Sequence, residues 1–276
     1  MNRPTERPNI STVALCIGAA LFVIVLIFGW QRLAVFAEDA YESVAYSIAP
    51  SPERAFAYGE RHFSAANGAQ YDLDRAYHFF MLAAATDPTY PYLFHEIARI
   101  SFLRGNFTLA LTQIDFQIDM HSNSEPNSYY VRALIEGFMG DYGMSAKDYE
   151  HFIQYDPNDW AAINDYAWVL LKAGRAQDAT DATLYGLGIF PDNPWLLNSN
   201  AIALYEIGDM KDARSQAVKA LDASETLTQA EWLHAYPGND PKIAAAGIAA
   251  FQKATTENMH TILSSTSSSA VQLTQP

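Results

Sequence analysis

The chain of 276 residues is 50% hydrophobic and 17% charged, so it can bury a core and is not disordered as a whole. Its net charge is −14, and because three arginines and one glutamate make the first 32 residues positive, the rest of the chain carries −16. That balance argues against sequence-independent binding to nucleic acid, which requires clustered cations, and against docking on anionic lipid. The single cysteine, Cys16, excludes a disulfide framework and a cysteine-based zinc site.

The first feature along the chain is an uncharged apolar run. Residues 10–30 read ISTVALCIGAALFVIVLIFGW, which as a helix is about 30 Å long, the thickness of a bilayer's hydrocarbon core. We therefore expect a single transmembrane helix that is retained as a signal-anchor. Arg3 and Arg7 precede it, so residues 1–9 are expected to form a cytoplasmic tail and the large C-terminal part to lie on the extracytoplasmic side.

A cleaved signal peptide is the alternative interpretation of this run. The sequence VFA at 35–37, before Glu38, has the small-residue pattern of a cleavage site, and cleavage would release a secreted or periplasmic protein. The retained anchor is favoured because the apolar run exceeds the ~7–15 residues of a signal peptide and because Arg32 interrupts the approach to the site.

A juxtamembrane helix is expected over residues 31–50. The apolar residues that recur there at helical spacing are Leu33, Phe36, Ala40, Val44 and Ile48. Pro50 and Pro52 end this helix, and Ser51 with Pro52 provides an N-cap and a first-turn proline for the helix that follows.

An internal period of 34 to 35 residues dominates the rest of the sequence. Four units each have an alanine and, seven residues later, a glycine: Ala98 and Gly105, Ala133 and Gly140, Ala167 and Gly174, Ala201 and Gly208. Five residues after each glycine stands a small residue, in turn Ala110, Ser145, Ala179 and Ala213. Small side chains permit two helices to approach closely, and glycine permits the left-handed conformation that ends a helix. Each unit is therefore predicted to be an antiparallel helical hairpin, and stacked hairpins bury a continuous core.

These units resemble the tetratricopeptide repeat over residues 91–222, most clearly in the third unit, 160–191. Upstream, Tyr58-Gly59, Asn67-Gly68 and Ala83-Ala84 resemble the Sel1-type repeat, a relative with a longer loop. The resemblance implies an all-α fold: a right-handed solenoid of five helical hairpins over residues 51–222. The sequence departs from the family pattern at Gln117 and Phe152, where the repeat has small residues.

The period is lost after residue 222, and residues 223–263 are expected to form capping helices that cover the open end of the solenoid. Ser224 is expected to cap a short helix through Trp232, and Asp240-Pro241 provides a cap and first-turn proline for a second helix. Residues 264–276, rich in serine and without charge, are expected to form a disordered tail.

Motifs for catalysis or metal binding are missing from the sequence. His95-Glu96 is followed by Arg99 where a zinc-protease helix needs its second histidine, and Asp72-Leu-Asp74 lacks the later ligands of a calcium loop. No glycine-rich phosphate loop and no nucleophile elbow is found. We therefore expect no enzymatic activity, no cofactor, no metal and no small-molecule substrate, although catalytic groups can also assemble from distant positions.

The resemblance implies that the first helix of each unit lines a concave groove that binds a protein or peptide. The candidate groove residues carried over from the repeat are Tyr92, His95, Arg99, Phe102, Asn127, Tyr130, Leu134, Asn164, Trp168, Trp195, Asn198, Ile202 and Tyr205. Aromatic rings provide contact area and amides can bond an extended backbone, which suits a peptide groove. The alternative is that these aromatics pack against a neighbouring helix or the C-terminal cap.

We therefore expect a non-enzymatic, membrane-anchored scaffold that mediates protein–protein interaction or complex assembly through its concave face. A signal-cleaved, soluble chaperone or carrier in the extracytoplasmic space is the alternative. An enzyme or enzyme subunit is a third possibility. The Lys/Asn/Arg clamp of chaperone-binding relatives is not reproduced, which argues against capture of a C-terminal carboxylate.

Overall fold

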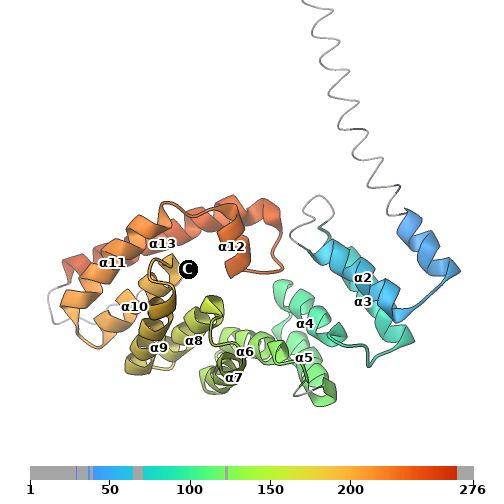
Figure 1. The fold of residues 1–276 in the computed structure, drawn as a ribbon, viewed down its shortest axis with the longest axis horizontal. Coiled ribbons are helices and arrows are strands. Elements are labelled where there is room, and N and C mark those ends of the chain that lie inside the picture. Colours follow the sequence, from blue (N-terminus) through green and yellow to red (C-terminus); the bar gives the residue numbers. More distant parts are fainter. Residues whose placement is uncertain (1–28, 30–36, 38–39, 65–70, 122–123, 266–276) are drawn as a thin grey trace, which may run out of the picture.

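The computed structural model describes Gly29, Ala37 and residues 40–64, 71–121 and 124–265. In these residues the secondary structure is helical and contains no strand, and the predicted all-α solenoid is confirmed (Figure 1). The hairpins are α2 (Pro52–Phe63) with α3 (Leu73–Thr86), α4 (Leu93–Leu103) with α5 (Phe107–His121), α6 (Asn127–Met139) with α7 (Tyr142–Tyr155), α8 (Trp160–Lys172) with α9 (Ala176–Ile189), and α10 (Pro194–Glu206) with α11 (Met210–Ser224). Each hairpin stacks on the next in a curved row.

The periodic glycines stand at the turns of the last four hairpins. Gly105, Gly140, Gly174 and Gly208 have φ of 73°, 88°, 74° and 86°, the left-handed region in which only glycine avoids a steric penalty. In each turn the residue after the glycine donates its N–H to a carbonyl five residues earlier, as Asn106 does to Ser101 at 2.9 Å. These bonds satisfy carbonyls that the end of the first helix would otherwise leave free.

The periodic small residues lie where helices cross. The eight side chains are at most 1% exposed: Ala98, Ala110, Ala133, Ser145, Ala167, Ala179, Ala201 and Ala213. Ser145 also donates its hydroxyl hydrogen to the carbonyl of Ala133 at 2.6 Å, which joins the two helices of that hairpin. Larger apolar side chains fill the space around these crossings, among them Phe80, Ile135 and Leu170, each fully buried. The core therefore runs along the row of hairpins and has no single centre.

Gln117, which departs from the repeat pattern, has a structural role at the start of α4. Its side-chain carbonyl accepts the N–H groups of Phe94 at 2.8 Å and His95 at 3.2 Å. Its amide donates to the buried carboxylate of Glu125. Tyr92, at the N-cap of α4, offers no side-chain cap and has a φ of 59°, so the neighbouring helix α5 provides the missing acceptor.

The segment before the solenoid is helical over residues 40–48 and packs on the first hairpin. The buried Glu42 carboxylate accepts a hydrogen bond from Arg61 at 2.9 Å and lies 2.8 Å from Nε2 of His62. After it, Ser51 caps α2 by accepting the N–H of Arg54 at 3.2 Å, with Pro52 in the first turn.

The expected cytoplasmic tail, residues 1–9, lies outside the described residues, and so does the expected membrane span, residues 10–30, apart from Gly29. Residues 31–36 and 38–39 of the expected juxtamembrane helix also lie outside them. Over the part of the chain that is described, no helix combines the length and the apolar character needed to cross a bilayer.

The C-terminal segment consists of α12 (Gln229–Ala235), the short 3-10 helix η3 (Pro241–Ile243) and α13 (Ala244–Ser264). Asp240 caps η3 by accepting the N–H of Lys242 at 2.9 Å. Helix α13 lies along α10 and α11, where Ile262 is fully buried. Ser265 is the C-cap of α13, and residues 266–276 of the expected tail lie outside the described residues.

The expected capping role of Ser224 is wrong. Ser224 is the last residue of α11, fully buried, and its hydroxyl donates to the carbonyl of Leu221 at 2.8 Å. Thr228 caps α12 instead. Its side chain accepts the N–H of Glu231, and the Glu231 carboxylate accepts the N–H of Thr228, which completes a reciprocal capping box.

Candidate functional site

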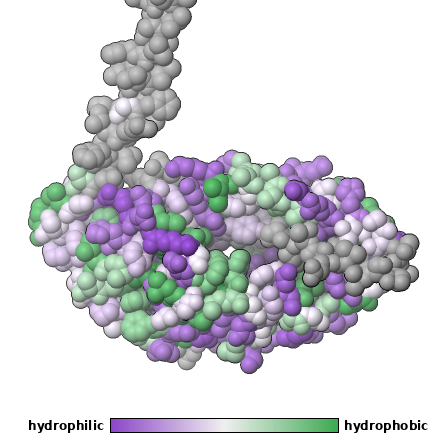
Figure 2. Space-filling model, turned by 180° about the vertical axis from the view of Figure 1, so that it is seen from behind, coloured by the Kyte–Doolittle hydropathy of each residue, from purple (hydrophilic) through white to green (hydrophobic). Residues whose placement is uncertain are grey.

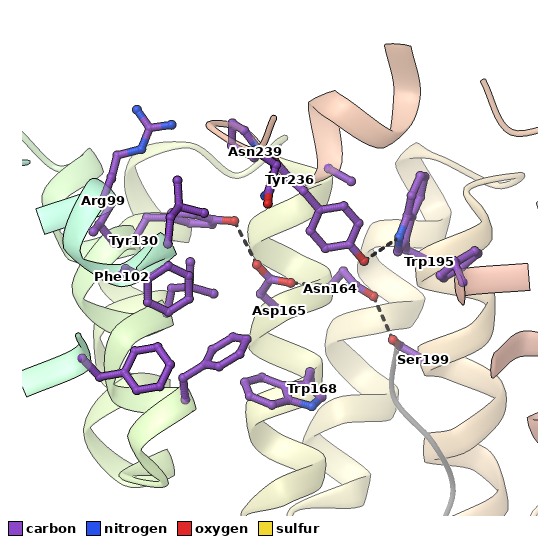
Figure 3. A pocket seen from close by; sticks show the side chains of 18 of the residues that line it. Arg99, Phe102, Tyr130, Asn164, Asp165, Trp168, Trp195, Ser199, Tyr236 and Asn239 are labelled. Carbon is purple, nitrogen blue, oxygen red and sulfur yellow. Dashed lines mark hydrogen bonds between the residues drawn. The ribbon is translucent and has the colours of Figure 1, made fainter. Parts of the chain in front are cut away.

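The concave side of the row contains a cavity of about 610 Å³ (Figure 3). Helices α4, α6, α8 and α10 form one wall, and the C-terminal segment forms the other. The space-filling view shows the molecule hollowed near its centre (Figure 2). Residues from four successive hairpins and from the C-terminal segment therefore line one cavity.

One part of the wall is aromatic. Phe102, Phe138 and Trp168 come from α4, α6 and α8, and their ring centroids are 5.0 Å apart for the two phenylalanines and 5.6 Å for Phe138 and Trp168. Phe138 is 54% exposed although it touches other rings, so it lies where the cavity opens to solvent. An exposed aromatic at the mouth of a cavity offers a contact surface to a partner.

A chain of hydrogen bonds crosses the floor of the cavity. The Tyr130 hydroxyl donates to Oδ2 of Asp165 at 2.9 Å, and the Asn164 amide lies 3.4 Å from Oδ1 of the same carboxylate. Ser199 donates to the Asn164 carbonyl at 2.8 Å. Figure 3 shows the Asp165 carboxylate between Tyr130 and Asn164, above Trp168. The side chains of α6, α8 and α10 are thus locked together by polar contacts at the centre of the site.

Asp165 is a carboxyl group in the cavity whose pKa is shifted far from its ordinary value. Burial raises its pKa from 3.8 to about 7, and the nearby charge of Asp159 adds to the rise, while the bonds from Tyr130 and Asn164 oppose it. Within the described residues Asp165 forms no ion pair with a lysine, arginine or histidine. A carboxylate surrounded by protein and without a cation is costly to ionise, which is why its pKa is high.

Arg99 is the cation that lines the cavity, but it is already paired. Its guanidinium donates to Glu96 at 2.7 Å and lies 4.7 Å from the ring centroid of Phe63. Nearby Glu60 has its pKa raised to about 7 by burial and by the charge of Glu96, partly offset by Arg99. The cation that lines this end of the cavity is therefore paired with Glu96 and lies near a second acid, Glu60.

A loop after α12 closes the cavity on its open side. We call residues 236–240 the closing loop. The Tyr71 hydroxyl, in the first hairpin, donates to the carbonyl of Gly238 at 2.5 Å. Gly238 has a φ of 92°, and a side chain there would begin 2.9 Å from Arg99 and 3.1 Å from Phe63. The segment after α12 therefore reaches back to the first hairpin and narrows the opening of the groove.

The closing loop is also held at the other end of the cavity. The Trp195 indole N–H donates to the Tyr236 hydroxyl at 3.2 Å. Trp195 stacks on Trp160 with ring centroids 4.9 Å apart and packs against Phe251 of α13 at 5.0 Å. This aromatic group joins α8 and α10 to the C-terminal segment.

The structure brings eight of the thirteen predicted groove residues to the cavity. They are Arg99, Phe102, Tyr130, Leu134, Asn164, Trp168, Trp195 and Asn198. Asn198 is only 2% exposed, and its side-chain carbonyl accepts a hydrogen bond from the Asn258 amide of α13 at 3.1 Å. A role of these residues in binding a partner stays a prediction.

The other five predicted groove residues lie elsewhere. Tyr92 stands at the start of α4, and Asn127 is exposed at the start of α6. His95 is buried beside Ser128, and burial lowers its pKa to about 3, so it is neutral. Ile202 and Tyr205 are buried in α10, and the Tyr205 hydroxyl lies 3.1 Å from that of Ser265.

Several cavity residues were not among the predicted ones. Asp165 directly follows the predicted Asn164, so position in the repeat could have indicated it. Tyr236 and Asn239 lie in a loop beyond the repeats, and Phe251 lies in α13, where the positions of the repeat do not apply. Only long-range packing places them. Across the described ranges no three His, Cys, Asp or Glu side chains gather in a way that could hold a metal ion.

The chain matches no known protein family and no curated protein. Its fold is similar to that of solved structures. A structure of the protein MamA superposes with a TM-score of 0.54 at 15% sequence identity, covering 66% of this chain and 94% of MamA. A structure of YrrB, described as a TPR protein with an unusual peptide-binding site, gives a TM-score of 0.56 at 11% identity, covering 67% and 93%. At these identities the similarity establishes the fold, a solenoid of helical hairpins like those of tetratricopeptide-repeat proteins.

Replacing Asp165 is expected to stabilise the protein above neutral pH. Below pH 3.8 the carboxyl is protonated in both the folded and the unfolded state, so it makes no pH-dependent contribution. Between that value and about 7 the unfolded chain ionises more readily, which lowers the free energy of unfolding, and the loss persists at higher pH. Asp165→Asn removes this loss, and we expect the free energy of unfolding to rise by about 2 kcal/mol at pH 8. This is less than the full pKa shift would give, because the carboxylate faces a cavity that water can enter.

Denaturant unfolding at pH 4 and pH 8 measures this difference. The matched control is Asp192→Asn, on an exposed turn, which should change the free energy of unfolding little at either pH. An equal effect of Asp165→Asn at the two pH values would show that the carboxyl titrates normally.

Adding a methyl group at Gly238 is expected to release the closing loop. Gly238→Ala forces a residue with a side chain into a positive φ and places a new carbon against Phe63 and Arg99. Gly140→Ala is the matched control, because Gly140 has a similar φ of 88° but open space around it. Amide hydrogen exchange of residues 236 and 238–240 should accelerate in Gly238→Ala and stay unchanged in Gly140→Ala. Equal protection in both variants would mean that the loop does not depend on this contact.

Proposed function

We propose that this chain is a non-enzymatic scaffold that binds a segment of a partner protein in its central cavity. The observation that carries this proposal is that four hairpins and the C-terminal segment line one cavity of about 610 Å³. That volume lies in the ~300–1,000 Å³ range of ligand sites, and the walls combine aromatic surface with a few polar groups that can fix orientation. A few side chains of a partner fill such a space, whereas a folded domain does not enter it.

The architecture supports a peptide as the bound segment. Stacked helical repeats present an extended inner surface, and YrrB, which shares the fold, is described as having a peptide-binding site. In this chain the amide of Asn164 and the hydroxyl of Tyr236 line the cavity beside aromatic rings, and both residues are partly exposed. Amides and hydroxyls can bond a peptide backbone while the rings hold its side chains.

Membrane attachment belongs to the same proposal. We propose that residues 10–30 anchor the scaffold as a single span, with the N-terminus cytoplasmic and the solenoid extracytoplasmic, and that the first hairpin is of the Sel1 type. The helix over residues 40–48 supports an organised connection, because the buried Glu42 ties it to α2 and α3 through Arg61 and Arg75. A docked helix between anchor and solenoid would hold the cavity at a defined distance from the bilayer.

A photoreactive amino acid at the mouth of the cavity is expected to capture the partner in living cells. We choose position 138 because Phe138 is 54% exposed and lies beside Trp168 in the wall of the cavity. The control position is 116, where Phe116 of the outer helix α5 is 43% exposed and packs on Phe94. A crosslinked protein should form from position 138 and not from 116, and adding Trp168→Ala to the chain that carries the photoreactive residue at 138 should reduce capture of the same protein several-fold. Capture from both positions, or from neither, would contradict the proposal.

The mass of the mature chain tests the anchor. A retained span predicts an intact N-terminus and extraction from membranes only by detergent. A mature chain that begins at Glu38 would instead support the soluble, signal-cleaved carrier, while leaving the proposed role of the cavity intact.

A further inference from the structure

We propose that the cavity selects partner segments that place a lysine or arginine side chain beside Asp165. This inference rests on the proposed function and names the chemistry of the bound segment. It starts from the position of Asp165, whose carboxylate lies in the centre of the cavity floor, between Tyr130 and Asn164 (Figure 3).

The Asp165 carboxylate has unused capacity to accept hydrogen bonds. An ionised carboxylate can accept about four, and each oxygen here has one donor from the chain, Tyr130 for Oδ2 and Asn164 for Oδ1. The Asn164 contact is long at 3.4 Å. A guanidinium or ammonium group reaching the floor would find acceptors that no described residue uses.

The aromatic wall suits the rest of a basic side chain. Trp168 follows Asp165 by three residues on α8, so both side chains lie on the same helix face. Phe138 packs against Trp168 with a centroid distance of 5.6 Å. Lysine and arginine bury an aliphatic stem while the charged end seeks a polar partner, and a ring face attracts the cation. Carboxylate and rings together therefore match both parts of one basic side chain.

The other charges around the cavity do not neutralise Asp165. Arg99 lines the same space, but it is committed to Glu96 at 2.7 Å and to the ring of Phe63. Glu96 accepts this bond, Glu60 lies close to both groups, and burial raises the pKa of each acid. An anionic segment, such as a free C-terminal carboxylate, would meet these acids and would have to displace Glu96 from Arg99.

The protonation of Asp165 supports the same inference. Its pKa is raised to about 7 because burial penalises the charge and no cation offsets it. The titratable and charged groups near it are Tyr130 on α6, Tyr149 on α7, Asp159 at the start of α8 and Tyr236 in the closing loop. The pKa of each tyrosine is raised, so all three stay neutral near pH 7. A bound cation would favour the ionised carboxylate, and its affinity should rise as the pH passes through about 7.

Peptide libraries with one fixed residue test the charge preference. We would measure binding of the full-length chain, in detergent, to fluorescent twelve-residue random peptides whose central residue is lysine, arginine, norleucine or glutamate. Norleucine keeps the lysine stem without the charge. At pH 8 the lysine and arginine libraries should bind about tenfold more tightly than the norleucine library, and the glutamate library most weakly.

Two variants separate the local charge from the general negative charge of the chain. Asp165→Asn should reduce binding of the lysine library about tenfold, leave the norleucine library within about twofold and abolish the pH dependence near 7. Asp192→Asn removes the same charge on an exposed turn and should change neither library. n-Butylamine serves as a free-amine competitor and should displace the lysine library only at far higher concentration than a lysine peptide does.

Each contrary result identifies what has failed. Equal binding of lysine and norleucine libraries, with no effect of Asp165→Asn, would refute the charge preference and leave the scaffold role standing. A loss of lysine binding in Asp192→Asn as large as in Asp165→Asn would also refute it, because attraction would then be nonspecific. Displacement by n-butylamine as effective as by peptide would refute a peptide segment as the ligand. If no library binds and position 138 crosslinks to nothing, the proposed function itself fails.

Discussion

The close approach of neighbouring helices at small side chains is the constraint on which the rest of this structure depends. An alanine or serine at each crossing lets two helices pack along their length, as Ala133 and Ser145 do, and a glycine turn returns the chain at the correct spacing. A single hairpin built in this way cannot bury its apolar face alone. Stacking solves that problem and curves the row, which brings the inner helices α4, α6, α8 and α10 around a common space.

Closure of the row then changes the character of that space. The C-terminal segment covers the inner face of α10 and extends back to the first hairpin, where Tyr71 holds Gly238. An open groove would leave Asp165 in contact with bulk water and its pKa close to the ordinary value. Packing around the carboxylate limits its contact with water without providing a cation, so the carboxylate becomes both a destabilising group and a strong attachment point. The same burial thus accounts for the pH dependence of stability and for the proposed preference for basic side chains.

Part of the candidate site could be predicted from the sequence. Positions carried over from the repeat placed Tyr130, Asn164 and Trp168 on the inner wall, because the helical period fixes which face of α6 and α8 turns inward. The same rule placed Ile202 and Tyr205 on that wall, yet both are buried in α10, where α13 packs. Repeat positions describe a unit among identical neighbours. They do not apply where the neighbour is a different structure.

Local interactions explain what the sequence determined by itself: the helices, the caps at Ser51 and Asp240 and the glycine turns all depend on residues within one or two turns of one another. The hairpin fold followed from these, because each unit repeats the same short-range pattern. The closing contact between Tyr71 and Gly238 joins residues 167 positions apart, and no period connects them. The tertiary structure alone decided that contact, and with it the enclosure of the cavity and the environment of Asp165, because both depend on the summed curvature of five hairpins.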